Sequence, residues 1–137
     1  MIEQLDQHYA VLRQKVSAMR ALCRSSVPDI GQISHARHEL MAVSMKRSRY
    51  LQQEVYPLLR QANVPGIPGV IADLDRDLAE RRAWVNRHVA TWTLDRIRED
   101  WAGYREASAH VARGIEDRIR LEQVALRPAL ISTYAKI

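Results

Sequence analysis

Several features that would identify a class of protein are scarce or absent in this 137-residue sequence. It contains no Phe, so its aromatic volume must come from three Trp and five Tyr. No apolar run approaches the roughly 18 to 20 residues that a membrane-spanning helix needs. The opening segment, MIEQLDQHYAVLRQ, carries acidic residues early and lacks the apolar centre of a secretory signal. We therefore expect a cytoplasmic protein with no membrane partner.

Catalytic signatures are also missing. The single cysteine, Cys23, excludes an internal disulfide and fits a reducing compartment. There is no P-loop, no Rossmann glycine pattern, no HExxH and no GxSxG. No motif pairs a nucleophile with a base, so the sequence does not support an enzyme. The net charge of +5 is too small and too dispersed to indicate a nucleic-acid partner.

Glycine and proline are few and gather in two clusters, at residues 25–31 and 63–69, with a weaker break near 99–104. Between these breaks the apolar residues recur every three or four positions, which predicts amphipathic helices and no strands. The expected helices cover residues 2–24, 32–62, 70–98 and 104–127.

Four such helices with short connections predict an all-α fold. We expect an up-and-down antiparallel four-helix bundle built from two similar helical hairpins. The chain would be one domain, 1–137. Its parts would be hairpin one (1–62), a linker (63–69), hairpin two (70–127) and a C-terminal tail (128–137), because Pro128 suggests a helix end.

The apolar stripes are interrupted by polar residues at repeated positions. The first and third helices each place one His in the stripe, His8 and His88, and the second places Arg47 there. The fourth places Arg118 four residues before Glu122, the usual spacing of an ion pair on a helix. The hairpins therefore carry the same polar pair, a His on one helix and an Arg on the next.

The spacing of these pairs allows a geometric prediction. In an antiparallel hairpin, residues equally far from the turn lie at the same height, since both helices rise by about 1.5 Å per residue. Residues 8 and 47 are equally far from the break near Pro28, and 88 and 118 are equally far from Gly103. The sequence thus predicts one polar layer in which His8, His88, Arg47, Arg118 and Glu122 meet.

At this point the chain resembles the hemerythrin-like (HHE, cation-binding) four-helix bundles. The segments that carry the resemblance are RSRYLQQEVYPLL, from Arg47, and RIRLEQVALRPAL, from Arg118. In both, a Pro follows ten residues after an Arg that stands where the family has its His. The resemblance implies that His8, His88 and Glu122 match metal-ligand positions. It also implies that Arg47 and Arg118 replace two histidines and that Leu51 replaces a Glu.

A guanidinium has no lone pair for a metal and stays protonated, so the resemblance implies a largely lost di-iron site. We expect no cofactor and a binding or regulatory role. One alternative is a mononuclear site for iron or another divalent cation on His8, His88 and Glu122, used for sensing or redox chemistry. Another is a bundle that binds a small anion, because one acid against two Arg leaves positive charge. A second acid, such as Glu54, would also neutralise that charge.

The remaining expectation concerns protein partners. Trp101 and Tyr104 stand near a predicted turn, where partly exposed aromatic side chains would suit a homodimer or another protein partner.

Overall fold

The computed structural model describes residues 1–136, and all of its regular structure is helical, which confirms the all-α class. Over this range the chain forms six α-helices and one π-helical segment. In chain order they are α1 (Ile2–Leu22), α2 (Ile30–Tyr50), η1 (Leu51–Val55), α3 (Tyr56–Gln61), α4 (Ile67–Thr91), α5 (Leu94–Glu99) and α6 (Trp101–Ala135).

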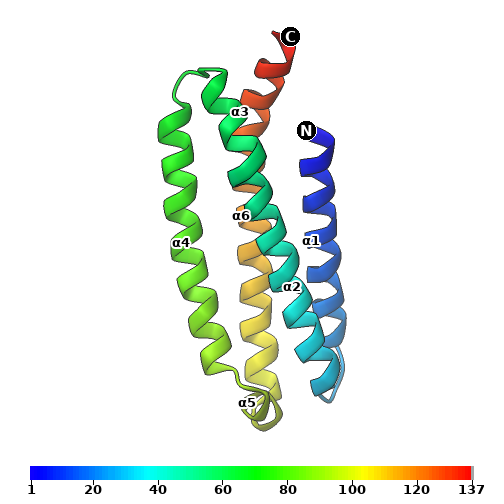
Figure 1. The fold of residues 1–137 in the computed structure, drawn as a ribbon. Coiled ribbons are helices and arrows are strands. Elements are labelled where there is room, and N and C mark those ends of the chain that lie inside the picture. Colours follow the sequence, from blue (N-terminus) through cyan, green and yellow to red (C-terminus); the bar gives the residue numbers. More distant parts are fainter. Residues whose placement is uncertain (137) are drawn as a thin grey trace.

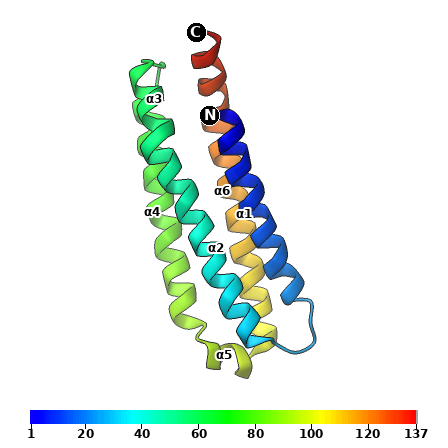
Figure 2. The same ribbon diagram turned by 45° about the vertical axis from the view of Figure 1, so that its right-hand side comes forward.

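The long helices lie side by side (Figure 1). Helix α1 packs along α2 and α6, and α4 packs against α6 and α3. Helices α2 and α4, in contrast, are not a closely packed pair. Figure 2 shows α2, η1 and α3 as one continuous rod beside α1. None of the described helices is both long enough and apolar enough to cross a membrane.

Short polar side chains cap the N-termini of three helices. Asp29 accepts a hydrogen bond from the backbone N–H of Gln32 at the start of α2. Thr93 and Asp100 do the same for α5 and α6. Each of these oxygens satisfies a backbone donor that has no partner within the helix. The sequence predicts one helix over residues 70–98, whereas the structure ends α4 at Thr91 and forms α5 as a separate helix.

The π-helical segment has a cause in the sequence. Pro57 has no backbone N–H, and the ring of a proline clashes with the carbonyl four residues earlier in an α-helix. The backbone here shifts to bonds five residues apart, and the N–H of Tyr56 donates to the carbonyl of Leu51. Helix α3 then continues from Tyr56 without a break in the rod.

The fourth helix extends further than expected. Helix α6 runs through Pro128 to Ala135, so the prediction of a helix end near 127 and a separate tail from 128 is wrong. Leu130 and Thr133 beyond the proline are buried, and the Thr133 hydroxyl donates to the carbonyl of Ala129 at 2.8 Å. These contacts stabilise the last two turns. Helix α4 likewise begins at Ile67, inside the expected linker.

The core has two parts. The larger cluster combines buried residues of α1, η1, α3, α4 and α6, among them Tyr9, Leu51 and Ile119. The smaller cluster lies at the end of the molecule that holds α5 and includes Ile97 and Tyr104. Tyr104 is fully buried, so the expectation that it forms part of an exposed partner surface is wrong.

Candidate functional site

Three charged side chains meet in the larger core cluster. Arg47 comes from the last turn of α2, and Arg118 and Glu122 lie one turn apart on α6. Their exposed fractions are 2%, 3% and 0%. Charged groups at this depth require partners, because the loss of water costs several kcal/mol per ion in real proteins.

Glu122 bridges the two arginines. Its Oε2 accepts a hydrogen bond from Nε of Arg118 at 2.5 Å. Its Oε1 lies 3.3 Å from Nε of Arg47, an ion-pair contact that lacks the alignment of a hydrogen bond. One carboxylate thus faces two guanidinium groups on different helices, which joins α2 to α6 through charge.

A second carboxylate joins the cluster. Nη1 of Arg118 donates to Oδ2 of Asp77 on α4 at 2.9 Å and to the carbonyl of Leu74 at 2.9 Å. Asp77 also accepts from Nε of Arg81 at 2.7 Å. Glu54, which the sequence offered for this task, is exposed and makes no ion pair within residues 1–136. We call Arg47, Arg118, Glu122 and Asp77 the ion-pair network.

The surroundings affect the two arginines differently. Burial lowers the pKa of Arg47, and the charge of Glu122 only partly opposes this. Burial also acts to lower the pKa of Arg118, but Glu122 and Asp77 outweigh it, and the pKa rises. Both guanidinium groups remain charged at neutral pH, as arginine does in proteins.

Two buried tyrosines flank the network. Burial and then the charge of Glu122 raise the pKa of Tyr56 to about 12. The same two causes raise the pKa of Tyr9 further. Both hydroxyls therefore stay protonated. The Tyr9 hydroxyl has no hydrogen-bond partner among the described residues.

His8 lies at the edge of this region. Its ring packs on Tyr50, with 4.9 Å between the ring centroids. Burial, then the charges of Lys46 and Arg47, lower its pKa, so the imidazole is neutral at pH 7. The connection between α1 and α2 lies at residues 23–29, and Lys15 pairs with Glu39 across the two helices at 2.8 Å. The register predicted for the first hairpin therefore agrees with the structure.

His88 is not part of the polar layer, and the register predicted for the second hairpin is wrong. His88 packs between Trp84 and Tyr104, with centroid distances of 5.9 and 6.1 Å. Arg118 instead lies level with Asp77, about three turns or 16 Å from His88 along α4. The physical reason is helix α5, which moves the centre of the connection from Gly103 towards the N-terminus.

The donor set does not fit the family's di-iron centre, nor the mononuclear site expected on His8, His88 and Glu122. Within residues 1–136, no three His, Cys, Asp or Glu side chains lie close enough together to hold a metal ion. His88 is remote from Glu122, Leu51 packs into the apolar core, and both oxygens of Glu122 face arginines.

Sequence reasoning found three members of the network and missed Asp77. Asp77 lies next to the apolar stripe of its helix, so the stripe gave no signal for it. The level of Asp77 relative to Arg118 follows only once the position of α5 is known.

No protein-family model matches the chain, and no curated protein or solved structure shows significant similarity to it.

Proposed function

We propose that this chain is a binding or regulatory protein on a hemerythrin-like plan, an up-and-down four-helix bundle of two hairpins whose di-iron site is replaced by the ion-pair network. The observation that carries the proposal is the position of Glu122. This residue matches a ligand position of the family, and its two oxygens face the arginines that stand at the histidine positions.

The chemistry of the network favours an organic replacement over a weakened metal site. A dication needs lone pairs directed at it, whereas the guanidinium groups of Arg47 and Arg118 offer only N–H donors. Their two positive charges also repel a cation from this point. Glu122 pairs with both arginines, and Asp77 pairs with Arg118 as well as with the more exposed Arg81.

The role proposed for the network is structural specificity. Ion pairs buried this deeply contribute little net stability, because desolvation cancels much of the attraction. They disfavour every packing of the helices in which one buried charge is left without an ion-pair partner. In this chain they fix the height of α2, α4 and α6 relative to one another, since Arg47, Asp77 and Glu122 come from those three helices.

The Cys23 thiol, the one cysteine nucleophile in the sequence, is poorly suited to attack. Burial raises the pKa of Cys23, so the side chain stays in its thiol form at neutral pH. The thiolate is the reactive species of cysteine, and this thiol is therefore a weak nucleophile.

Thermal unfolding in the presence of metals tests the proposal. A ligand that binds only the folded state raises the melting temperature according to its concentration and affinity. We expect the same Tm in EDTA, Fe²⁺ under anaerobic conditions, Mn²⁺ and Zn²⁺. A rise in Tm with one of these ions that Glu122→Gln abolishes and Glu116→Gln preserves would contradict the proposal. Glu116 is a suitable control because it pairs with Arg13 at the surface.

A further inference from the structure

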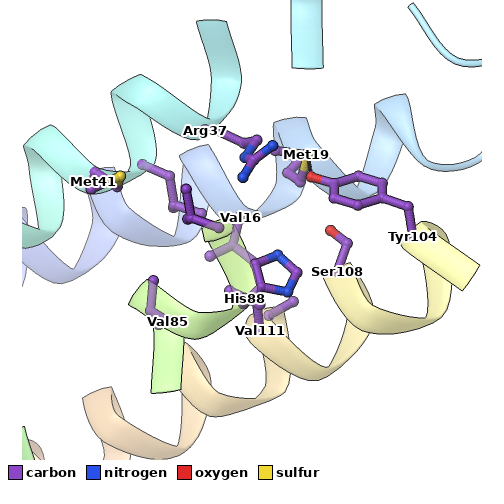
Figure 3. Close-up of a pocket in the computed structure, with 12 residues that line it drawn as sticks. Val16, Met19, Arg37, Met41, Val85, His88, Tyr104, Ser108 and Val111 are labelled. Carbon is purple, nitrogen blue, oxygen red and sulfur yellow. Dashed lines mark hydrogen bonds between the residues drawn. The ribbon is translucent and has the colours of Figure 1, made fainter. Parts of the chain in front are cut away.

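A pocket lies between α1, α2, α4 and α6 (Figure 3). The pocket lies nearer to α5 than the ion-pair network does. Its volume is about 50 Å³, and much of its wall is apolar. Val16, Met19, Val85 and Val111 supply part of that wall. A single water needs roughly 10 to 15 Å³ of such volume, so the pocket has room for a small organic group.

One end of the pocket is polar. Figure 3 shows the guanidinium of Arg37, the ring of His88 and the hydroxyl of Ser108 facing the same space. Nη1 of Arg37 donates to the carbonyl of Trp92 at 2.8 Å, and the guanidinium lies 6.0 Å from the ring centroid of Tyr104. The remaining N–H groups of Arg37 make no hydrogen bond within residues 1–136.

Among the described residues, no carboxylate lies within ion-pair distance of the Arg37 guanidinium, although this side chain is half-buried. Charges that lose part of their hydration without a partner are costly, and guanidinium groups have a fork of donors that matches a carboxylate. The pocket therefore favours a ligand that brings one negative charge.

His88 adds a donor without adding charge. Burial, then the neighbouring charge of Arg37, lower its pKa, so its ring is neutral at pH 7 and carries one N–H. The hydroxyl of Ser108, a residue that is 7% exposed, is a second uncharged donor. Both groups can donate hydrogen bonds to an anion that is paired with Arg37.

The open side of the pocket is also apolar. Met41 on α2 and Val89 on α4 line it and are 45% and 37% exposed. Since α2 and α4 are not closely packed, a short apolar chain can extend between them. Inorganic anions would leave this apolar wall in contact with water.

We propose that this pocket binds a small organic monocarboxylate. Its carboxylate pairs with Arg37 and accepts hydrogen bonds from His88 and Ser108, and its short aliphatic chain packs against the valines and Met41. The site is separate from the ion-pair network, about 15 Å away along α2. The proposal therefore does not depend on how that network replaced a metal site.

Titration calorimetry and NMR of the unmodified protein provide the test, with butyrate, 1-butanol and inorganic phosphate compared at equal ionic strength. Butyrate is expected to bind at least tenfold more tightly than either of the others, because only it offers both a single charge and an apolar chain. It should also shift the His88 imidazole signals and raise the pH at which they titrate. Equal affinity for butyrate and butanol, or for butyrate and phosphate, would overturn the proposal.

A pair of variants locates the site. Arg37→Gln is expected to weaken butyrate binding at least tenfold, whereas Arg105→Gln is expected to leave it unchanged. The Arg105 guanidinium also lies near an aromatic ring, 5.9 Å from the centroid of Trp101, but it is outside the pocket. An equal effect of both variants, or none for Arg37→Gln, would overturn the assignment. If Arg37→Gln fails to fold, the comparison of the three ligands still decides.

Discussion

Each oxygen of the Glu122 carboxylate faces a different guanidinium, one from α2 and one from its own helix. This residue is fully buried, so its charge is compensated only by the protein around it. Removal of that charge would leave Arg47 without an ion-pair partner, while Arg118 would keep Asp77. The stability of the network at the residue scale therefore depends mainly on Glu122.

Glu122→Gln is expected to lower the free energy of unfolding by about 3 to 5 kcal/mol, since it leaves a buried guanidinium uncompensated. Urea unfolding followed by circular dichroism measures this. The control, Glu116→Gln, breaks the exposed pair with Arg13 and should cost less than about 1 kcal/mol.

A second variant separates charge from shape. Simultaneous replacement of Arg47, Arg118 and Glu122 by Met, Leu and Leu removes the three charges together. Its loss of stability should be smaller than that of Glu122→Gln, because apolar groups of similar volume can replace buried ion pairs at little cost. If Glu122→Gln alone is as stable as the wild type, Glu122 does not compensate the charge of Arg47.

The two half-buried histidines predict a pH dependence of stability. Burial, followed by Lys46 and Arg47 for His8 and by Arg37 for His88, lowers both pKa values below 6.5 in the folded chain. Between pH 6.5 and these lowered values the unfolded chain binds more protons, so stability is present above pH 6.5 and is lost as the pH falls.

The measurement is the melting temperature at pH 7.5 and pH 5.5. The wild type should lose stability over this range, and a His8→Gln, His88→Gln double variant should lose less. An equal or steeper loss in the double variant would show that these imidazoles are not the groups responsible.

At the scale of elements, two prolines at equivalent positions have different effects. Pro57 and Pro128 follow ten residues after Arg47 and Arg118. The first is accompanied by the π-helical segment, whereas the second lies inside a continuous α-helix. The sequence alone could not distinguish them, because the residue two positions after each proline, Leu59 or Leu130, is buried in the same core cluster.

Pro128→Ala is expected to stabilise the protein by roughly 1 to 2 kcal/mol. An interior proline costs a helix about 3 kcal/mol, and part of that gain is offset by the greater freedom of the unfolded chain. Pro68→Ala is the matched control, because Pro68 stands in the first turn of α4, where proline is tolerated. The control should show no gain in urea unfolding. A loss of stability in Pro128→Ala would contradict this explanation.

Helix α5 shows what local reasoning could have recovered. Thr93 and Asp100 are good helix-capping residues, and each accepts a hydrogen bond from the backbone N–H three positions later. Those two signals bound α5, which lies almost wholly inside the single helix expected over residues 70–98. A capping residue inside a periodic stripe was thus the available evidence for a short separate helix.

At the scale of the whole molecule, the helical period predicted the fold class, but the heights of the helices depended on the length of the connections. The first connection was identified from its Pro and Ser residues, and the level of His8 and Arg47 followed from it. The second connection contains α5. His88 therefore lies away from Arg118, and Asp77 lies level with Arg118 instead. The ion-pair network and the pocket that contains His88 are therefore two sites at different heights along the helices.

Elemental analysis tests most directly the proposal that charged side chains stand where a hemerythrin-like bundle would hold its metal. The protein should be purified without chelators from cells grown with added iron, then dialysed and measured for iron, manganese and zinc per chain. We predict metal far below one ion per chain, in a protein that is folded by circular dichroism. A stoichiometric amount of metal that survives dialysis and is lost in Glu122→Gln would contradict the account.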